Sequence, residues 1–383
     1  MNKYKTFASF FNFFRIFQVK NHKVSFIGWR EPNLRGNLGY VHREFEKIGD
    51  FNYNFIYKDE YKISDVKSPS DAFKKIFGLF KLFILKSYHL ATSRYIFLSD
   101  NFLPMAFMNI PQKTVVVQLW HASGAFKKFG FSSVTDNGLR ELEKGIIDKM
   151  DYVIVSSNNV APFYEEAFGV SEEKVLALGI PRTDFYFENN DKNSIKNLRN
   201  NFENRYPQMK DKKVILYAPT FRDDPSVDRE IISNFNTCLF KEELSEYCVM
   251  IRLHPLMNQG DLQDNEEFID VTDYPDEKDL LLLADVLITD YSSIMVEYAL
   301  LNKPIIFYPY DYEYYVKEER GFYFDYMDTV PGPIAHSPQD IVKIIKEEDY
   351  DFDKIKEFTK IEFDYLDGKS THRVINYILT NHQ

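Results

Sequence analysis

The chain has 383 residues, of which 44% are hydrophobic and 27% charged, and this length suits two α/β domains rather than one hydrophobic core. The formal net charge of −11 argues against binding to nucleic acid, because such binding needs a basic face that displaces counterions. The two cysteines, Cys238 and Cys248, show no metal-ligand spacing and are too few for a disulfide framework, which favours a reducing cytoplasm.

Two phenylalanine-rich segments stand out in the first ninety residues. In residues 4–20 phenylalanines recur every three or four positions among basic residues, which predicts an amphipathic helix. Residues 73–90 repeat the pattern, with several lysines between the apolar positions. Both segments suit an anionic membrane surface, although such stripes also suit packing on a protein core. The sequence predicts neither a transmembrane helix nor a signal peptide.

From residue 114 onward the pattern alternates between strands and helices. Apolar runs that predict strands lie at 114–119, 152–156, 214–218, 248–253, 286–289 and 304–308. Continuous apolar strands separated by helices indicate parallel sheets that are covered on both faces. We therefore predict an α/β fold with two Rossmann-like domains, 1–190 and 213–383, whose sheets face a cleft. The polar segment 191–212 is expected to connect them, and the final helix to pack back on the N-terminal domain.

A histidine directly follows the predicted strand that ends at Leu119. His121 stands in the run W-H-A-S-G-A at 120–125, where small residues leave a ligand unobstructed access. Imidazole suits proton abstraction near neutral pH, and ligands of open α/β sheets bind at the carboxyl ends of strands. A lone histidine at such a place is more often structural, so this position does not decide the function by itself.

Two strand ends in the second half carry groups that suit phosphate. Arg252 and His254 offer a two-pronged donor and one further hydrogen bond, although a capped strand end explains the same pattern. Ser292 and Ser293 begin a predicted helix, where hydroxyls and backbone N–H groups converge on an anion or simply cap the helix. Glu297, one turn later, is expected to reach a substrate hydroxyl.

Together these motifs resemble the CDP-glycerol glycerophosphotransferase family of teichoic-acid synthesis. The matching segments are WHASGAFKKFG at 120–130, GIPRTD at 179–184, YAPTFRD at 217–223, RLHP at 252–255, ADVLITDYSSIMVEYALLNKPIIFY at 284–308, RGFYFD at 320–325 and PGP at 331–333. They agree in order and spacing over roughly residues 118–373, about two thirds of the chain, and the N-terminal third matches loosely. The W-H-A-x-G-A-x-K form is closer to the family's primases than to its polymerases, which often carry Asp in place of Glu297.

The resemblance implies a GT-B architecture and assigns roles to individual residues. The C-terminal domain, 213–383, would hold the nucleotide donor, and residues 1–190 would form a membrane-proximal acceptor domain. His121 would deprotonate the acceptor hydroxyl, and His254 would steady the pyrophosphate or the departing CMP. The implied donor-binding residues are Ala122, Ser123, Gly124, Ala125, Arg182, Pro219, Thr220, Arg252, Leu253, Ser292, Ser293 and Glu297.

The resemblance also implies the reaction. Glycerol phosphate would pass from CDP-glycerol to a hydroxyl of an undecaprenyl-diphosphate-linked glycan, releasing CMP at the cytoplasmic face of the membrane, where the protein is expected to be peripheral. Neither a cofactor nor a metal ion is expected, because Asp351-Phe352-Asp353 reads as a helix cap in an acidic run. A homo-oligomer is compatible with the sequence. A CDP-ribitol donor, a sugar donor on the same architecture and a non-catalytic membrane scaffold remain open as alternatives.

Overall fold

The computed structural model describes residues 2–28, 33–57, 77–133, 136–224, 230–254, 257, 267–319 and 321–382. The chain divides into two compact units. Unit 1 comprises Met1–Ala122, Phe129–Asp184 and Lys369–Gln383, and unit 2 comprises Ser123–Lys128 and Phe185–Gly368. The chain therefore passes from one unit to the other inside the W-H-A-S-G-A run itself.

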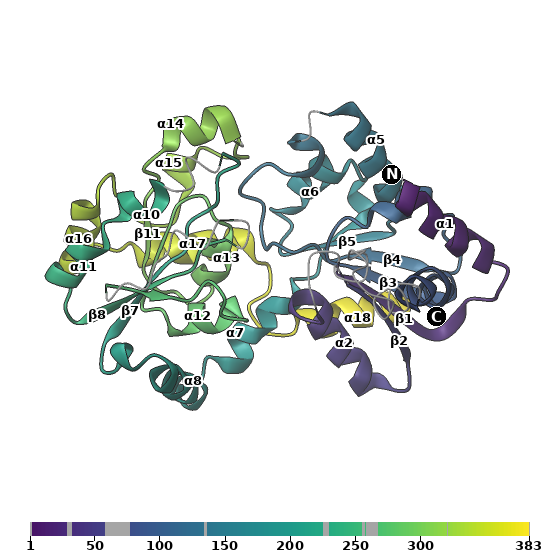
Figure 1. Cartoon of the computed structure of the whole chain (residues 1–383), viewed down its shortest axis with the longest axis horizontal. Helices are drawn as coiled ribbons and strands as arrows, with labels where there is room; N and C mark the ends of the chain where they lie inside the picture. Colours follow the sequence, from purple (N-terminus) through teal and green to yellow (C-terminus); the bar gives the residue numbers. More distant parts are fainter. Residues whose placement is uncertain are drawn as a thin grey trace, which may run out of the picture. The chain divides into compact units, whose positions relative to one another are not determined.

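Unit 1 contains a six-stranded sheet in the order β2-β1-β3-β4-β5-β6, and all five strand pairs are parallel (Figure 1). The strands are β1 (Lys20–Gly28), β2 (Asn52–Tyr57), β3 (Ser93–Leu98), β4 (Val115–Gln118), β5 (Tyr152–Val155) and β6 (Val175–Ala177). β4 is buried at every position, as expected for a strand covered on both faces.

Helices and short helical turns surround this sheet. They are α1 (Asn2–Phe14), α2 (Gly36–Ile48), η2 (Lys81–Lys86), α4 (Ser87–Ala91), η3 (Leu103–Phe107), η4 (Gly130–Ser132), α5 (Asn137–Ile147), α6 (Ala161–Phe168), η5 (Glu172–Lys174), η6 (Pro181–Thr183) and α18 (Ser370–Asn381). The last helix, α18, packs against α2, and Val374, Ile375 and Ile378 join the apolar core over β1. Its first turn is capped by Asp184, whose carboxylate accepts from the amides of Ser370 and Thr371 at 2.8 Å each.

The two phenylalanine-rich segments pack against each other. Phe7 and Phe11 of α1 are fully buried, and the Phe7 and Phe10 rings lie 6.3 and 5.8 Å from the ring of Phe83. The opposite side of α1 and the residues after it remain open, with Phe13 63% and Ile16 73% exposed. Core packing thus accounts for part of each stripe, and residues 73–76 lie outside the described part of the chain. In the described residues, no helix combines the length and apolarity needed to cross a bilayer.

Unit 2 contains a five-stranded sheet in the order β11-β10-β7-β8-β9, again with parallel pairs throughout (Figure 1). The strands are β7 (Lys213–Tyr217), β8 (Tyr247–Ile251), β9 (Ile269–Asp270), β10 (Val286–Thr289) and β11 (Ile305–Phe307). Successive β7 residues enter opposite cores: Val214 and Leu216 join one apolar cluster, whereas Ile215 and Tyr217 join another. The prediction of an α/β fold with two parallel sheets is confirmed.

The remaining elements of unit 2 are mainly helical. They are α7 (Asp184–Asn189, which starts at the last residue of unit 1), α8 (Lys192–Arg205), η7 (Pro207–Met209), α10 (Glu230–Phe235), α11 (Thr237–Glu243), α12 (Glu277–Leu283), α13 (Ile294–Ala299), α14 (Tyr312–Tyr314), η9 (Tyr315–Glu319), α15 (Tyr326–Thr329), α16 (Pro338–Glu347) and α17 (Phe352–Glu362). The segment 191–212, expected as a connection, forms α8 and η7 within unit 2. Asp191 caps α8. Phe202, which is 2% exposed, anchors this helix in the core of unit 2.

Candidate active site

A buried ion network joins the loops that follow β7, β10 and β11 in unit 2. The Arg222 side chain is fully buried, and its Nη2 lies 2.9 Å from Asp290 Oδ2 and 2.8 Å from Asp311 Oδ1, with Nε 2.6 Å from Asp311 Oδ2. Tyr291 adds a hydrogen bond to Asp311 at 3.0 Å. Although burial opposes the charge, the two carboxylates raise the pKa of Arg222, which therefore stays cationic.

The network fixes the position of Thr220, one of the sequence-predicted donor-binding residues. The amide of Thr220 donates to Asp290 Oδ1 at 2.8 Å, which ties the residue after Pro219 to the loop that carries Ser292 and Ser293. The Thr220 hydroxyl is buried and has no hydrogen-bond partner among the described residues. A buried hydroxyl without a partner costs free energy, so it is a group that a bound ligand would satisfy.

The residues around β8 are anchored to the segment that follows β9. Arg252 donates through Nη1 to the carbonyls of Val271 at 3.2 Å and Tyr274 at 2.9 Å, so this nitrogen already serves the fold. The adjacent amide of Leu253 donates to the Thr272 hydroxyl at 3.1 Å. These bonds hold the R-L-H strand end in place, and a phosphate role for Arg252 would have to use its other nitrogens.

His254 is exposed at the end of this segment. Its ring lies 4.5 Å from the ring of Phe221, in the loop after the neighbouring strand β7. The structure thus brings the R-L-H and P-T-F-R-D motifs together at one edge of the sheet, where the strand-end rule places ligands. Pro255 lies outside the described residues.

Glu297 on α13 is bonded within unit 2. Its two carboxylate oxygens accept from the hydroxyls of Ser123 and Tyr186, both at 2.9 Å, and its side chain is 2% exposed. In this structure Glu297 holds the Ser123–Lys128 segment to α13. Its contact with a substrate hydroxyl stays a prediction.

A second buried carboxyl lies under the same segment. Glu362, the last residue of α17, is 3% exposed, and its Oε2 has no hydrogen-bond partner among the described residues. A Cβ placed on Gly124, which has a φ of +71°, would lie 2.2 Å from this oxygen. Burial raises the pKa of Glu362 to about 7. The W-H-A-S-G-A run therefore rests on a carboxyl group that sequence reasoning missed.

In unit 1, the backbone around His121 has an unusual conformation. Trp120 has a φ of +55°, which is uncommon for a bulky residue and requires support from its surroundings. The buried side chain of Asn37 supplies that support, because its amide donates to the carbonyls of Leu119 at 3.3 Å and Trp120 at 2.9 Å. Asn37 also accepts from the amide of Arg182 at 2.9 Å, and Arg182 Nη1 donates to the His121 carbonyl at 3.1 Å.

The His121 side chain combines a buried and an accessible part. Its Nδ1 is buried and lies 2.9 Å from Asp100 Oδ1, at the end of β3, while the side chain as a whole is 36% exposed. Sequence reasoning missed Asn37 and Asp100. Asp100 follows the run Y-I-F-L at 95–98 after one serine, so the strand-end rule applied to that run would have found it.

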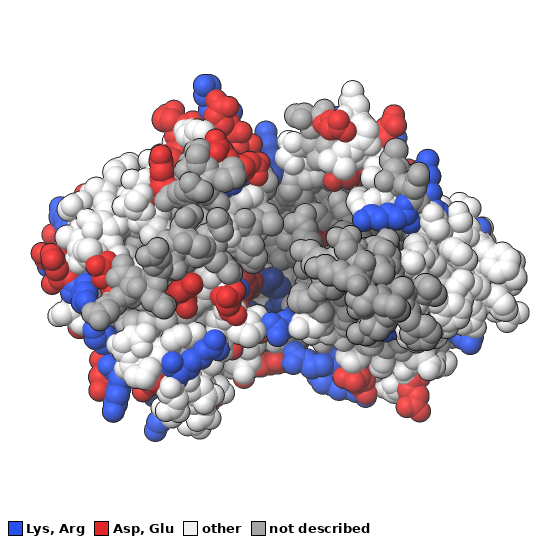
Figure 2. Space-filling model, viewed as in Figure 1, with Lys and Arg blue, Asp and Glu red and all other residues white. Residues whose placement is uncertain are grey.

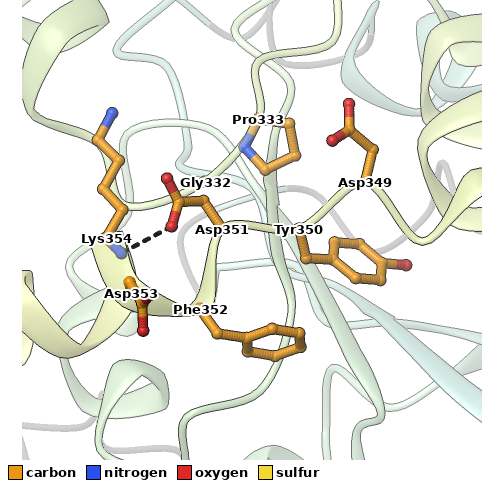
Figure 3. Close-up of a pocket in the computed structure, with 8 residues that line it drawn as sticks. All are labelled: Gly332, Pro333, Asp349, Tyr350, Asp351, Phe352, Asp353 and Lys354. Atoms are coloured by element: carbon orange, nitrogen blue, oxygen red, sulfur yellow. Dashed lines mark hydrogen bonds between the residues drawn. The ribbon is translucent and has the colours of Figure 1, made fainter.

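An open pocket of about 510 Å³ lies elsewhere in unit 2 (Figure 3). Gly332 and Pro333 of the P-G-P motif line it together with residues 349–354, and none of the predicted site residues does. Asp351 caps α17 by accepting from the amide of Lys354 at 2.9 Å, as the sequence predicts for the D-F-D run. Within the described ranges, no group of three or more His, Cys, Asp or Glu side chains gathers to hold a metal ion.

The buried Glu362 gives a testable pH dependence. Its folded-state pKa of about 7 lies above the value of 4.5 for an unperturbed Glu, so the folded state binds more protons between these values and stability falls as pH rises through them. Glu362→Gln should remove this loss, which amounts to about 3 kcal/mol. The free energy of unfolding, measured by denaturant titration at pH 5 and pH 8, should therefore favour the variant more at pH 8. Glu357→Gln, on the exposed side of the same helix, is the matched control, and an equal difference at both pH values would rule out a buried, titrating Glu362.

Known proteins resemble this chain over almost its whole length. It is 38% identical to a teichoic acid poly(ribitol-phosphate) polymerase of Bacillus spizizenii, with 96% of this chain covered, although it spans only 58% of that protein. It is 34% identical to a teichoic acid ribitol-phosphate primase of the same organism, covering 94% of this chain and 91% of the primase. A teichoic acid glycerol-phosphate primase of Bacillus subtilis is 29% identical, with 98% and 97% covered.

The fold and the family are shown by two further comparisons. The wall teichoic acid polymerase TagF superimposes with a TM-score of 0.79 at 24% identity, over 98% of this chain and 94% of that one, which confirms the GT-B-like α/β fold. The model of the family described as CDP-glycerol:poly(glycerophosphate) glycerophosphotransferase matches residues 9–380. The chain therefore belongs to this family of glycerophosphotransferases, as its motifs predict.

Proposed function

We propose that this chain transfers a polyol phosphate from a CDP-activated polyol to a hydroxyl of a lipid-linked glycan acceptor in teichoic acid synthesis, and releases CMP. The observation that carries the proposal is the way in which the side chain and backbone of His121 are held. Its ring is partly exposed, its Nδ1 is buried beside a carboxylate, and its backbone is held by Asn37 and Arg182 after a residue with positive φ. A positioned histidine of this kind suits a general base.

The proposed reaction needs a base and a set of fixed positive or donating groups. The acceptor hydroxyl gives its proton to His121, and its oxygen bonds to the phosphorus that carries the polyol. The bond from that phosphorus to the bridging oxygen of the pyrophosphate breaks, and CMP leaves with this oxygen. Stabilising such a transfer is mainly a matter of positioning and charge. We assign this task to His254, Arg252, the hydroxyls of Ser292 and Ser293, and the unpartnered hydroxyl of Thr220.

For the polyol we propose ribitol as the first candidate and glycerol as the second. Two relatives named for ribitol phosphate are 38% and 34% identical to this chain, whereas the glycerol-phosphate primase of Bacillus subtilis is 29% identical. The family description, which names CDP-glycerol, supports the second candidate. The two donors share the cytidine and both phosphates, so the same phosphate-binding groups serve either one.

Donor use and the role of His121 are tested together. Purified protein is incubated with CDP-ribitol or CDP-glycerol and a lipid-linked glycan acceptor, and CMP release and polyol incorporation are measured. Wild type should turn over CDP-ribitol faster than CDP-glycerol. His121→Ala should lower kcat by a factor on the order of 10²–10⁴, because it removes the base. Donor affinity should change little, because the residues proposed to bind the phosphates are unaltered. Turnover of neither donor would reject the proposed function, and near-normal turnover of His121→Ala would assign the base to another residue.

We also propose that the protein is peripheral at the cytoplasmic face of the membrane and that α1 forms part of its contact with anionic lipid. The surface over α1 is largely uncharged with scattered Lys and Arg, whereas the surface over α14 is dense in Asp and Glu (Figure 2). The exposed fraction is 63% for Phe13, 73% for Ile16 and 47% for Phe17. In the second phenylalanine-rich segment it is 59% for Phe77 and 51% for Phe80. Exposed aromatic residues beside basic ones suit the interfacial region of a bilayer.

Vesicle sedimentation tests the membrane proposal. Wild type should bind vesicles of anionic phosphatidylglycerol and bind them less at high salt, because lysine–headgroup attraction is screened. Changing Phe13, Ile16 and Phe17 to Ser should weaken binding on the order of 10-fold or more, since the inserted apolar area is lost. The matched control changes three scattered exposed residues, Leu139, Val316 and Leu366, to Ser. Equal sedimentation of both triple variants would contradict a specific role for α1.

A further inference from the structure

The parallel pairing of β3 and β4 places the carboxylate of Asp100 beside the proposed base, His121. β3 and β4 are parallel neighbours in register, with Leu98 opposite Gln118, so the residues that follow them meet at one edge of the sheet. Asp100 comes two residues after β3 and His121 three residues after β4. The Asp100 side chain is 3% exposed, and its Oδ1 lies 2.9 Å from His121 Nδ1.

One buried side chain links the main chain of Asp100 to that of Trp120, the residue before His121. Gln118 is fully buried, and its Nε2 donates to the Asp100 carbonyl at 3.4 Å while its Oε1 accepts from the Trp120 amide at 2.9 Å. Asn37 holds the Trp120 carbonyl from the other side at 2.9 Å. Because both backbones are fixed by buried amides, the approach of Asp100 to His121 is a property of the fold rather than of two mobile side chains.

The chemistry of a carboxylate next to Nδ1 determines which nitrogen carries the proton. A negative charge at 2.9 Å stabilises a proton on Nδ1, and the neutral ring then keeps its lone pair on Nε2. In this structure the two atoms are at ion-pair distance without the alignment of a hydrogen bond. Nδ1 is buried although 36% of the His121 side chain is exposed, so other atoms of the side chain account for the exposed part.

We infer that Asp100 is a positioning residue for His121: it holds the Nδ1–H tautomer and directs Nε2 to the acceptor hydroxyl. When Nε2 takes the proton of that hydroxyl, the ring becomes a cation and the buried carboxylate stabilises it. Asp100 itself neither gains nor loses a proton in this step. The inference rests on the proposed function of His121 as base, but its first part, the tautomer, is a property of the free protein.

The test begins with the tautomer, which needs no substrate. Long-range ¹H–¹⁵N correlation spectra of histidine-labelled protein distinguish an imidazole protonated at Nδ1 from one protonated at Nε2. His121→Gln identifies the His121 signal among the eight histidines. Neutral His121 of the wild type should carry its proton on Nδ1. A wild-type ring protonated on Nε2 would overturn the inference, and this result is independent of whether any variant folds.

Kinetics then test the second part. Asp100→Asn should shift the tautomer toward Nε2–H and lower kcat on the order of 10²-fold or more, while KM for the CDP-polyol stays near its wild-type value. Glu143→Gln is the matched control, because it removes another partly buried carboxylate, which accepts from Asn101 next to Asp100. Wild-type kcat in Asp100→Asn would overturn the inference, as would an equal loss in Glu143→Gln. A correct tautomer in a protein that transfers neither polyol would reject the proposed function and leave the pairing intact.

Discussion

The buried guanidinium of Arg222 imposes the strongest single constraint on unit 2. A buried charge without partners costs several kcal/mol, so the loops after β7, β10 and β11 must close until Asp290 and Asp311 meet Arg222. Once Asp290 is fixed, its other oxygen and its carbonyl organise further groups: Oδ1 receives the amide of Thr220, and the carbonyl receives the hydroxyl of Tyr326. The ion network therefore sets the backbone from which the proposed donor-binding hydroxyls project.

In unit 1, the segments around His121 are held in position by a neutral side chain and a helix cap. Asn37 joins the strand end before His121 to the P-R-T-D turn, and Asp184 of that turn caps α18. The G-I-P-R-T-D motif thus serves the fold at Asp184, and at Arg182 it holds the backbone of His121, the proposed base. Motif residues of this chain divide in the same way in unit 2, where Arg222 and Asp290 hold the loops while Thr220, Ser292 and Ser293 carry the hydroxyls that we propose for donor binding.

The sequence alone was sufficient for the fold class and for the histidine, because both depend on local patterns. Buried parallel strands appear as continuous apolar runs, and His121 directly follows one of them. Asn37 and Asp100 were missed, since Asn37 lies in α2 and Asp100 after β3, 84 and 21 residues before His121, and only the tertiary structure brings them to the strand end beside it. The phenylalanine stripe of α1 was ambiguous for a related reason. Phe7 is buried and Phe13 exposed because a second helical segment covers one side, and periodicity does not identify that partner.

The most direct test of this account is calorimetric titration of the CDP-polyol into Arg222→Lys, well below the unfolding temperature of the variant. Lysine keeps the charge but lacks the planar fork that binds both carboxylates, so the loops carrying Thr220 and Ser292 should lose their positions. Arg199→Lys is the matched control, because Arg199 pairs with Glu203 on the surface of α8. We predict that Arg222→Lys weakens donor binding on the order of 10-fold or more, while Arg199→Lys leaves it unchanged. Wild-type donor affinity in folded Arg222→Lys would contradict the claim that this ion network builds the donor site.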